Sequence, residues 1–201
     1  MRVLLLGFGC TILASADQVQ FSLSTSGDFS SGTPSNLGFS GNAGITGTTD
    51  NAGFLALSNL GTFTLSKPDR AADNYDGSTF TLNLFFVAPA GIDGQTVFNA
   101  ALTGTVNTQL GSVLIDFGPA QTFHFNDGIQ SGGFDLTIND LSLTIPHSNT
   151  LTVSQILQGS ITNAYDPPVG TDPVPEPVSI VMLGSATLLI AAKYRKQIRK
   201  N

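Results

Sequence analysis

Apolar and polar residues alternate along most of the chain with a period of two, which is typical of half-buried strands rather than of helices. The run at residues 80–87 alternates clearly and is broken by Pro89 and Gly91. Turn-forming pairs such as Asp76-Gly77 separate this run from its neighbours. Ten further runs follow the same pattern: 19–23, 54–57, 61–65, 98–106, 113–117, 121–125, 134–138, 141–145, 150–154 and 159–164.

About nine to eleven short strands at this spacing predict a single antiparallel β-sandwich of jelly-roll or immunoglobulin-like kind. Residues 24–51 are rich in Gly, Ser and Asn and poor in apolar positions, so we expect them to be irregular. Residues 153–157 are expected to turn briefly helical. The core is expected to contain Phe63, Phe80, Leu82, Leu84, Phe98, Leu102, Val106, Ile115, Phe117, Phe123, Phe125, Phe134, Leu136 and Ile138.

The N-terminal segment departs from this pattern. Arg2 gives it a positive start, an apolar stretch follows, and Ala14 and Ala16 form an A-x-A cleavage site. We therefore expect residues 1–16 to be a signal helix that is removed on export. A buried first strand or helix is one alternative, and a lipid anchor at Cys10 is another. Cys10 is the only cysteine, so the mature chain is expected to hold no disulfide.

The C-terminal segment departs from it as well. Residues 167–177 form a proline-rich linker, residues 178–192 an apolar run, and residues 193–201 a basic tail. A helix over the apolar run would be roughly 22 Å long, against a hydrocarbon core of about 30 Å, so we expect a short transmembrane helix. By the positive-inside rule the tail stays in the cytoplasm and the body, residues 17–166, lies outside. The stop-transfer residues are Lys193, Arg195, Lys196, Arg199 and Lys200.

The tripeptide Pro175-Glu176-Pro177, followed by this short apolar run and basic tail, resembles the PEP-CTERM sorting domain of Gram-negative and cyanobacterial exported proteins. In that family an inner-membrane exosortase recognises the signal, and the product moves toward the outer surface, in association with extracellular polysaccharide. The resemblance implies that the tripeptide is the recognition motif and that residues 178–192 are a transient membrane anchor. It covers only the residues from Val174 onward.

Charge excludes one class of partner. Residues 17–177 contain all fourteen acidic residues but only two basic ones, Lys67 and Arg70. Such a surface repels phosphate groups, so nucleic-acid binding is not expected. Enzyme activity is not expected either, because the chain has no G-x-S-x-G elbow, and His124 and His147 are its only histidines. His124 is expected on the exposed face of its strand.

The best metal candidate is the acidic loop at residues 69–77, where Asp73 and Asp76 could offer carboxylate oxygens to calcium. The loop lacks the EF-hand spacing and its closing glutamate, so a solvated hairpin loop is the favoured interpretation. No cofactor is therefore expected, with calcium as the alternative.

These patterns predict an exported surface or extracellular-matrix protein with a structural or adhesive role, held in the inner membrane before processing. Its expected partners are an exosortase-type enzyme, the inner membrane and extracellular polysaccharide. A carbohydrate-binding module is the first alternative, against which stand the absence of Trp and the presence of only three Tyr. A secreted hydrolase and a permanently anchored single-pass envelope protein are the others.

Overall fold

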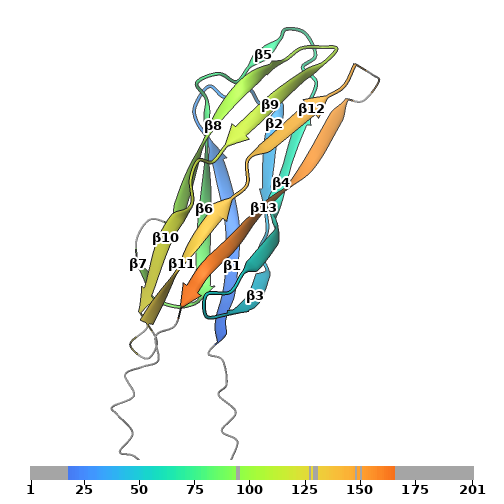
Figure 1. Ribbon diagram of the computed structural model, residues 1–201. Coiled ribbons are helices and arrows are strands. Elements are labelled where there is room, and N and C mark those ends of the chain that lie inside the picture. The colour runs from blue at the N-terminus through green and yellow to red at the C-terminus, as the bar shows by residue number, and fades with distance from the viewer. Residues whose placement is uncertain are drawn as a thin grey trace, which may run out of the picture. The chain divides into compact units, whose positions relative to one another are not determined.

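A computed structural model describes residues 18–93, 96–126, 128, 131–147, 149 and 151–165. These residues form thirteen strands in two antiparallel sheets and contain no helix (Figure 1), which confirms the prediction of a mainly β protein. The predicted signal helix and transmembrane helix lie outside the described residues. Within the described part of the chain, no helix has the length and apolar character needed to cross a membrane.

Sheet A has seven strands, in the order β12-β9-β8-β6-β1-β3, with β5 also pairing with β8. All of its pairs are antiparallel. Its strands are β1 (Gln18–Phe29), β3 (Ile45–Asp50), β5 (Asp73–Asn74), β6 (Thr79–Ala88), β8 (Val97–Val106), β9 (Gly111–Asp116) and β12 (Leu141–Ile145).

Sheet B has six strands, in the order β2-β4-β13-β11-β10-β7, and its pairs are antiparallel as well. Its two long central strands, β4 and β13, cross most of the sheet. Its strands are β2 (Leu37–Gly41), β4 (Leu55–Ser66), β7 (Ile92–Asp93), β10 (Gln121–Asn126), β11 (Ser131–Ile138) and β13 (Thr152–Tyr165).

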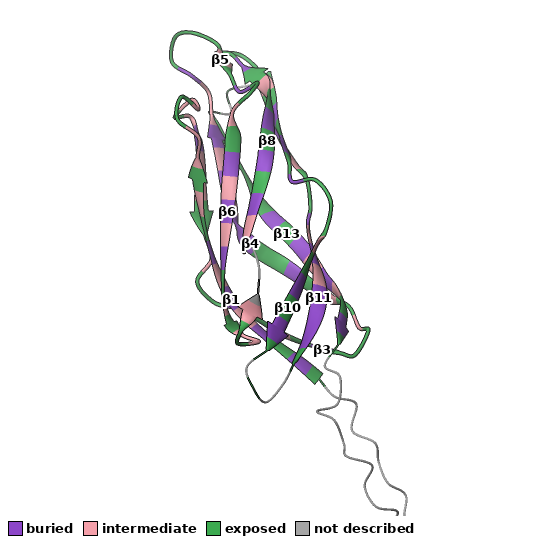
Figure 2. Cartoon of the chain, turned by 90° about the vertical axis from the view of Figure 1, so that its left-hand side faces the viewer, coloured by how far each residue is buried: buried purple, intermediate pink, exposed green. Residues whose placement is uncertain are grey.

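The alternation in sequence becomes an alternation of burial along the strands (Figure 2). Strand β10 shows it well, since Phe123 and Phe125 are buried and His124 between them is exposed. The expected core is confirmed in full. All of its predicted members are buried: Phe63, Phe80, Leu82, Leu84, Phe98, Leu102, Val106, Ile115, Phe117, Phe123, Phe125, Phe134, Leu136 and Ile138.

The buried faces of the two sheets contact each other through phenylalanine rings. Phe21 of β1 meets Phe134 of β11 with ring centroids 5.0 Å apart and nearly perpendicular planes. Phe80 of β6 meets Phe63 of β4 at 4.8 Å in an edge-to-face arrangement. Such pairs contribute about 0.5–1.5 kcal/mol beyond the area that they bury. The core therefore lies between the two sheets and contains side chains from both.

The expectation of irregular structure over residues 24–51 is wrong. Strand β1 continues to Phe29, and β2 and β3 lie within the segment. The few apolar residues are enough, because Leu37 and Ile45 are buried and Phe39 packs against the core. Ser40 occupies an exposed position of β2, and Thr46 and Thr48 occupy exposed positions of β3.

The expected helical turn at residues 153–157 is also wrong, because these residues belong to β13 and pair with β4. Two pairs of predicted strands are single strands in the structure. Runs 54–57 and 61–65 merge into β4, in which Gly61 has a φ of 137° and a Cβ in its place would clash with the Phe39 ring. Runs 150–154 and 159–164 merge into β13, which has an irregular register between Leu157 and Gly159.

The start and the end of the described chain both contact the end of β3 and the turn that follows it. Gln18 at the start of β1 pairs with Asp50 at the end of β3. Two residues further on, the amide of Ala52 donates a hydrogen bond of 2.6 Å to the carbonyl of Ala164 near the end of β13. The start of β1 and the end of β13 therefore lie together (Figure 1), and we call this the exit end.

The opposite end is called the far end. It contains the turn between β8 and β9, the segment after β4, and the connection from β12 to β13. Lys67 follows β4 there, and its amide donates to the carbonyl of Leu151 at 2.8 Å.

Candidate functional site

The residues predicted to direct sorting lie outside the described residues. They comprise the motif Pro175, Glu176 and Pro177, the cleavage-site residues Ala14 and Ala16, and the basic tail. The described part of the chain therefore bears only on the β-sheet body.

In the acidic loop, protein groups hold both candidate calcium ligands. The amide of Asn36 donates to Asp73 Oδ2 at 2.6 Å, and the backbone amide of Gly104 donates to Asp76 Oδ1 at 2.9 Å. Within the described residues, no group of three or more His, Cys, Asp or Glu side chains is arranged to hold a metal ion. The loop thus uses its carboxylates as acceptors that fasten β5 to its neighbours.

Tyr75 lies between these two aspartates and is fully buried. Its hydroxyl has no hydrogen-bond partner among the described residues. Burial, together with the negative charge of Asp73, raises the pKa of Tyr75 to about 12. A buried hydroxyl without a partner costs about 1–3 kcal/mol of stability.

Tyr75→Phe is therefore expected to stabilise the protein by about 1 kcal/mol at neutral pH. In the wild type, the Tyr75 hydroxyl ionises near pH 10 when the chain is unfolded and only near pH 12 when it is folded. Ionisation of Tyr75 therefore costs no stability below pH 10, and about 2 kcal/mol is lost as the pH rises to 12. Denaturant unfolding across this pH range should show the loss in the wild type and not in Tyr75→Phe.

Tyr165→Phe is the matched control, because the Tyr165 side chain is 45% exposed. It should leave both the neutral-pH stability and the alkaline loss unchanged. An alkaline loss that persists in Tyr75→Phe would contradict the assignment to Tyr75.

The two histidines lie at opposite ends of the sheets, so they do not form one site. His147 is at the far end, where it lines a depression of about 500 Å³ with Lys67, Gln109 and other polar residues. A neighbouring depression of about 470 Å³ shares His147 and extends over β9 and β12. His124 is at the exit end, on the exposed face of β10 as predicted.

Around His124, three strands bring polar side chains together on the outer face of sheet B. Thr122 of β10 donates from Oγ1 to Asp135 Oδ1 at 2.6 Å. Asn163 of β13 donates from Nδ2 to Asp135 Oδ2 at 2.7 Å. These neutral donors hold the pKa of Asp135 below its ordinary value, with a smaller contribution from His124. The carboxylate is therefore fixed in position and ionised.

A β-bulge brings Asn163 into this arrangement. The register between β11 and β13 shifts between Gly133 and Asp135, and Asn163 has a φ of 53°. Asparagine tolerates this left-handed conformation better than most residues. In a regular strand, successive side chains point to opposite faces of the sheet. The bulge interrupts this alternation and turns the Asn163 side chain toward Asp135.

A glycine lets the side chains of Tyr165 and His124 approach each other. Gly133 pairs with His124 on one side and with Tyr165 on the other. A Cβ at Gly133 would lie 2.9 Å from Tyr165 Cε1 and 3.0 Å from His124 Nδ1. Without it, the Tyr165 hydroxyl comes to 3.5 Å from His124 Nδ1, the limit of a hydrogen bond.

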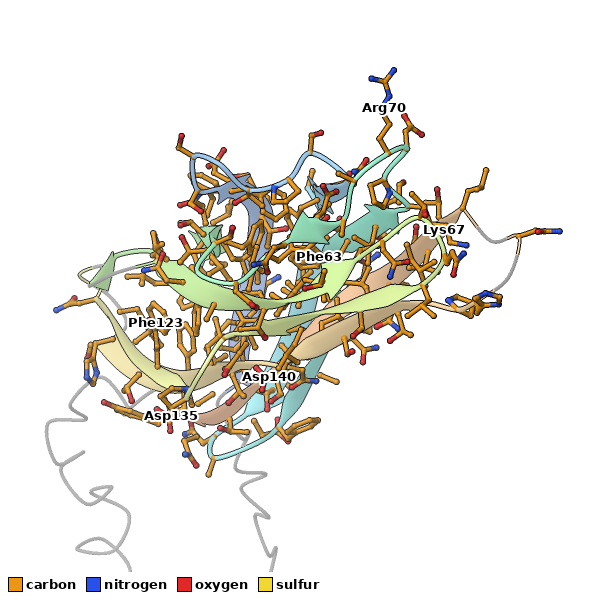
Figure 3. All side chains as sticks on the ribbon, turned by 90° about the horizontal axis from the view of Figure 1, so that it is seen from above. Phe63, Lys67, Arg70, Phe123, Asp135 and Asp140 are labelled. Atoms are coloured by element: carbon orange, nitrogen blue, oxygen red, sulfur yellow. The ribbon has the colours of Figure 1, made fainter. Side chains whose placement is uncertain are left out.

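We call this group the outer-face cluster; it comprises Thr122, His124, Asp135, Asn163 and Tyr165. Figure 3 labels Asp135, which lies on the opposite side of β11 from the buried Phe134 and Leu136. Of these residues, sequence reasoning singled out only His124. The sequence alone does not indicate a site at Asp135, Asn163 and Gly133. Only the register of β10, β11 and β13 brings these residues together.

A scan against protein-family models, a search of curated proteins and a search of solved structures each found no match to this chain.

Proposed function

We propose that the chain is an exported surface or extracellular-matrix protein with a structural or adhesive role, sorted and processed through its C-terminal signal. Its body is a single β-sandwich, which the ring contacts between the buried faces of sheets A and B support. The signal helix, the Pro175-Glu176-Pro177 motif, the apolar run and the basic tail carry the sorting part of the proposal.

One structural observation carries this function. The bond between Ala52 and Ala164 and the pairing of Gln18 with Asp50 bring the start of β1 and the end of β13 together at the exit end. This arrangement suits a body that is attached through the segment after β13, because the outer faces of both sheets and the far end then stay uncovered by the attachment.

Carbohydrate binding is the second candidate function. The few tyrosines argue against it at the level of composition, but Tyr165 is 45% exposed and lies beside hydrogen-bonding side chains. Sugars bind to proteins through an aromatic face together with such groups. The outer-face cluster supplies both kinds of contact on rigid strands.

Intact-mass analysis of the native protein, with cell fractionation, tests the sorting proposal. The wild type is expected to end near Pro177 and to be found outside the inner membrane. Glu176→Ala is expected to keep residues 193–201 and to remain in the inner membrane, because the acid between the two prolines is the centre of the proposed motif.

Asp172→Ala is the matched control, because it also removes one acid from the linker but leaves the motif intact. It should be processed like the wild type. If wild type and Glu176→Ala both keep the full tail in the membrane, the segment is a permanent anchor and the sorting proposal fails.

A further inference from the structure

The outer-face cluster has an unusual charge environment. Strands β10, β11 and β13 contain no Lys or Arg. The two basic residues of the described chain, Lys67 and Arg70, both follow β4 at the far end, where Arg70 projects away from the sheets (Figure 3). The Asp135 carboxylate therefore has the His124 imidazole as its neighbour and no permanently cationic residue on its own three strands.

Asp135 can accept more hydrogen bonds than the protein gives it. An ionised carboxylate has about four lone-pair sites, and Thr122 and Asn163 occupy one on each oxygen. Both donors are neutral, so they orient the carboxylate without cancelling its charge. The remaining sites on this fixed anion suit a cationic donor, whose hydrogen bonds are stronger than those of a neutral one.

Tyr165 supplies the second part of the site. Its ring is 45% exposed on the same face, and it pairs with Gly133, two residues from Asp135 along β11. Gly133 and Asp135 are roughly 7 Å apart along the strand, so one saccharide can contact both the Tyr165 ring and the Asp135 carboxylate. An aromatic face packs against a sugar ring and also attracts a cation.

We propose that the outer-face cluster binds a glycan that carries free amino groups, with Asp135 pairing with the ammonium group and Tyr165 packing against the sugar ring. This deepens the carbohydrate-binding candidate of the proposed function by naming the ligand class. The far-end depression lined by Lys67 is less suited to an ammonium group, because that side chain is itself cationic.

The test uses two oligosaccharides with one backbone. Glucosamine oligomers carry amino groups, and N-acetylglucosamine oligomers of the same length carry neutral amides instead. Calorimetric titration of the full-length protein at near-neutral pH should show about tenfold tighter binding of the amino form. This preference should weaken as salt is added, because screening acts on the charge pair and not on ring packing.

Two variants locate the site, and each has a matched control on sheet A. Asp135→Asn and Tyr165→Ala should each weaken binding of the amino form about tenfold, whereas Tyr165→Phe should retain it. Asp28→Asn removes an exposed acid that also accepts a bond from an amide side chain, and Phe85→Ala removes a ring that is 57% exposed. Both controls should bind like the wild type, and thermal unfolding checks that every variant is folded.

Equal binding of the two oligomers, no binding of either, or equal losses in the sheet A controls would overturn the proposal. If a variant does not fold, the salt dependence of glycan binding by the wild type still tests the proposal. Sorting is measured by mass and fractionation without any glycan, so a failure of this inference is distinguishable from a failure of the sorting proposal.

Discussion

Replacing Phe80 by alanine is expected to lower the free energy of unfolding by about 3–5 kcal/mol, the usual cost of removing a buried phenyl ring. The ring is fully buried in β6 and lies 4.8 Å from Phe63 and 4.9 Å from both Phe29 and Phe39, between ring centroids. Its loss leaves a cavity where sheets A and B meet. Since domains of this size are stable by about 5–15 kcal/mol, denaturant unfolding of the full-length protein should show a large shift.

Phe85→Ala is the matched control on the same strand. Its ring is 57% exposed, so removing it should change stability by no more than about 0.5 kcal/mol. Similar losses in the two variants would show that contact between the sheets does not depend on the buried ring of Phe80.

Thr25→Val is expected to cost about 2–4 kcal/mol, although the two side chains have nearly the same shape. The Thr25 hydroxyl is buried, donates to the carbonyl of Leu60 at 2.6 Å and accepts from the amide of Asn42 at 2.9 Å. It thereby joins β1 of sheet A to β4 of sheet B. Valine leaves both backbone groups without this partner, and each such group costs about 1–3 kcal/mol when buried.

Denaturant unfolding measures this loss, and faster hydrogen exchange at the Asn42 amide would locate it. Thr25→Ser keeps the hydroxyl and should recover most of the stability. Thr64→Val is the control, because its hydroxyl is exposed and bonds only to Ser154 across the strands, at 3.2 Å. If Thr25→Val is as stable as Thr64→Val, the buried hydroxyl does not join the sheets.

The sequence predicted the core better than it predicted the limits of the strands. Period-two runs with phenylalanine, such as that around Phe80, identify a buried face without further information. Strands β2 and β3 escaped notice because Leu37 and Ile45 stand almost alone among Gly, Ser and Thr, and their burial depends on neighbours distant in sequence. Runs 54–57 and 61–65 were predicted as separate strands, but the Asn59 side chain accepts the Gly61 amide and β4 continues through both residues.

The outer-face cluster was beyond sequence reasoning for a different reason. His124 and Tyr165 are 41 positions apart, and only the register of β10, β11 and β13 brings them together. A shift of one residue would turn Asp135 toward the core. The bulge at Asn163 has no sequence signature that distinguishes it from an ordinary polar position in a strand.

The course of β13 determines how the protein would carry a mechanical load. This strand runs from the far end, where Thr152 pairs with Ser66, to the exit end, and it pairs with β4 on one side and β11 on the other. When the protein is held at Tyr165 and pulled from the far end, the force lies along the strands. The hydrogen bonds of both ladders are then loaded in shear and must fail together, whereas a strand peeled from a sheet edge loses them one at a time.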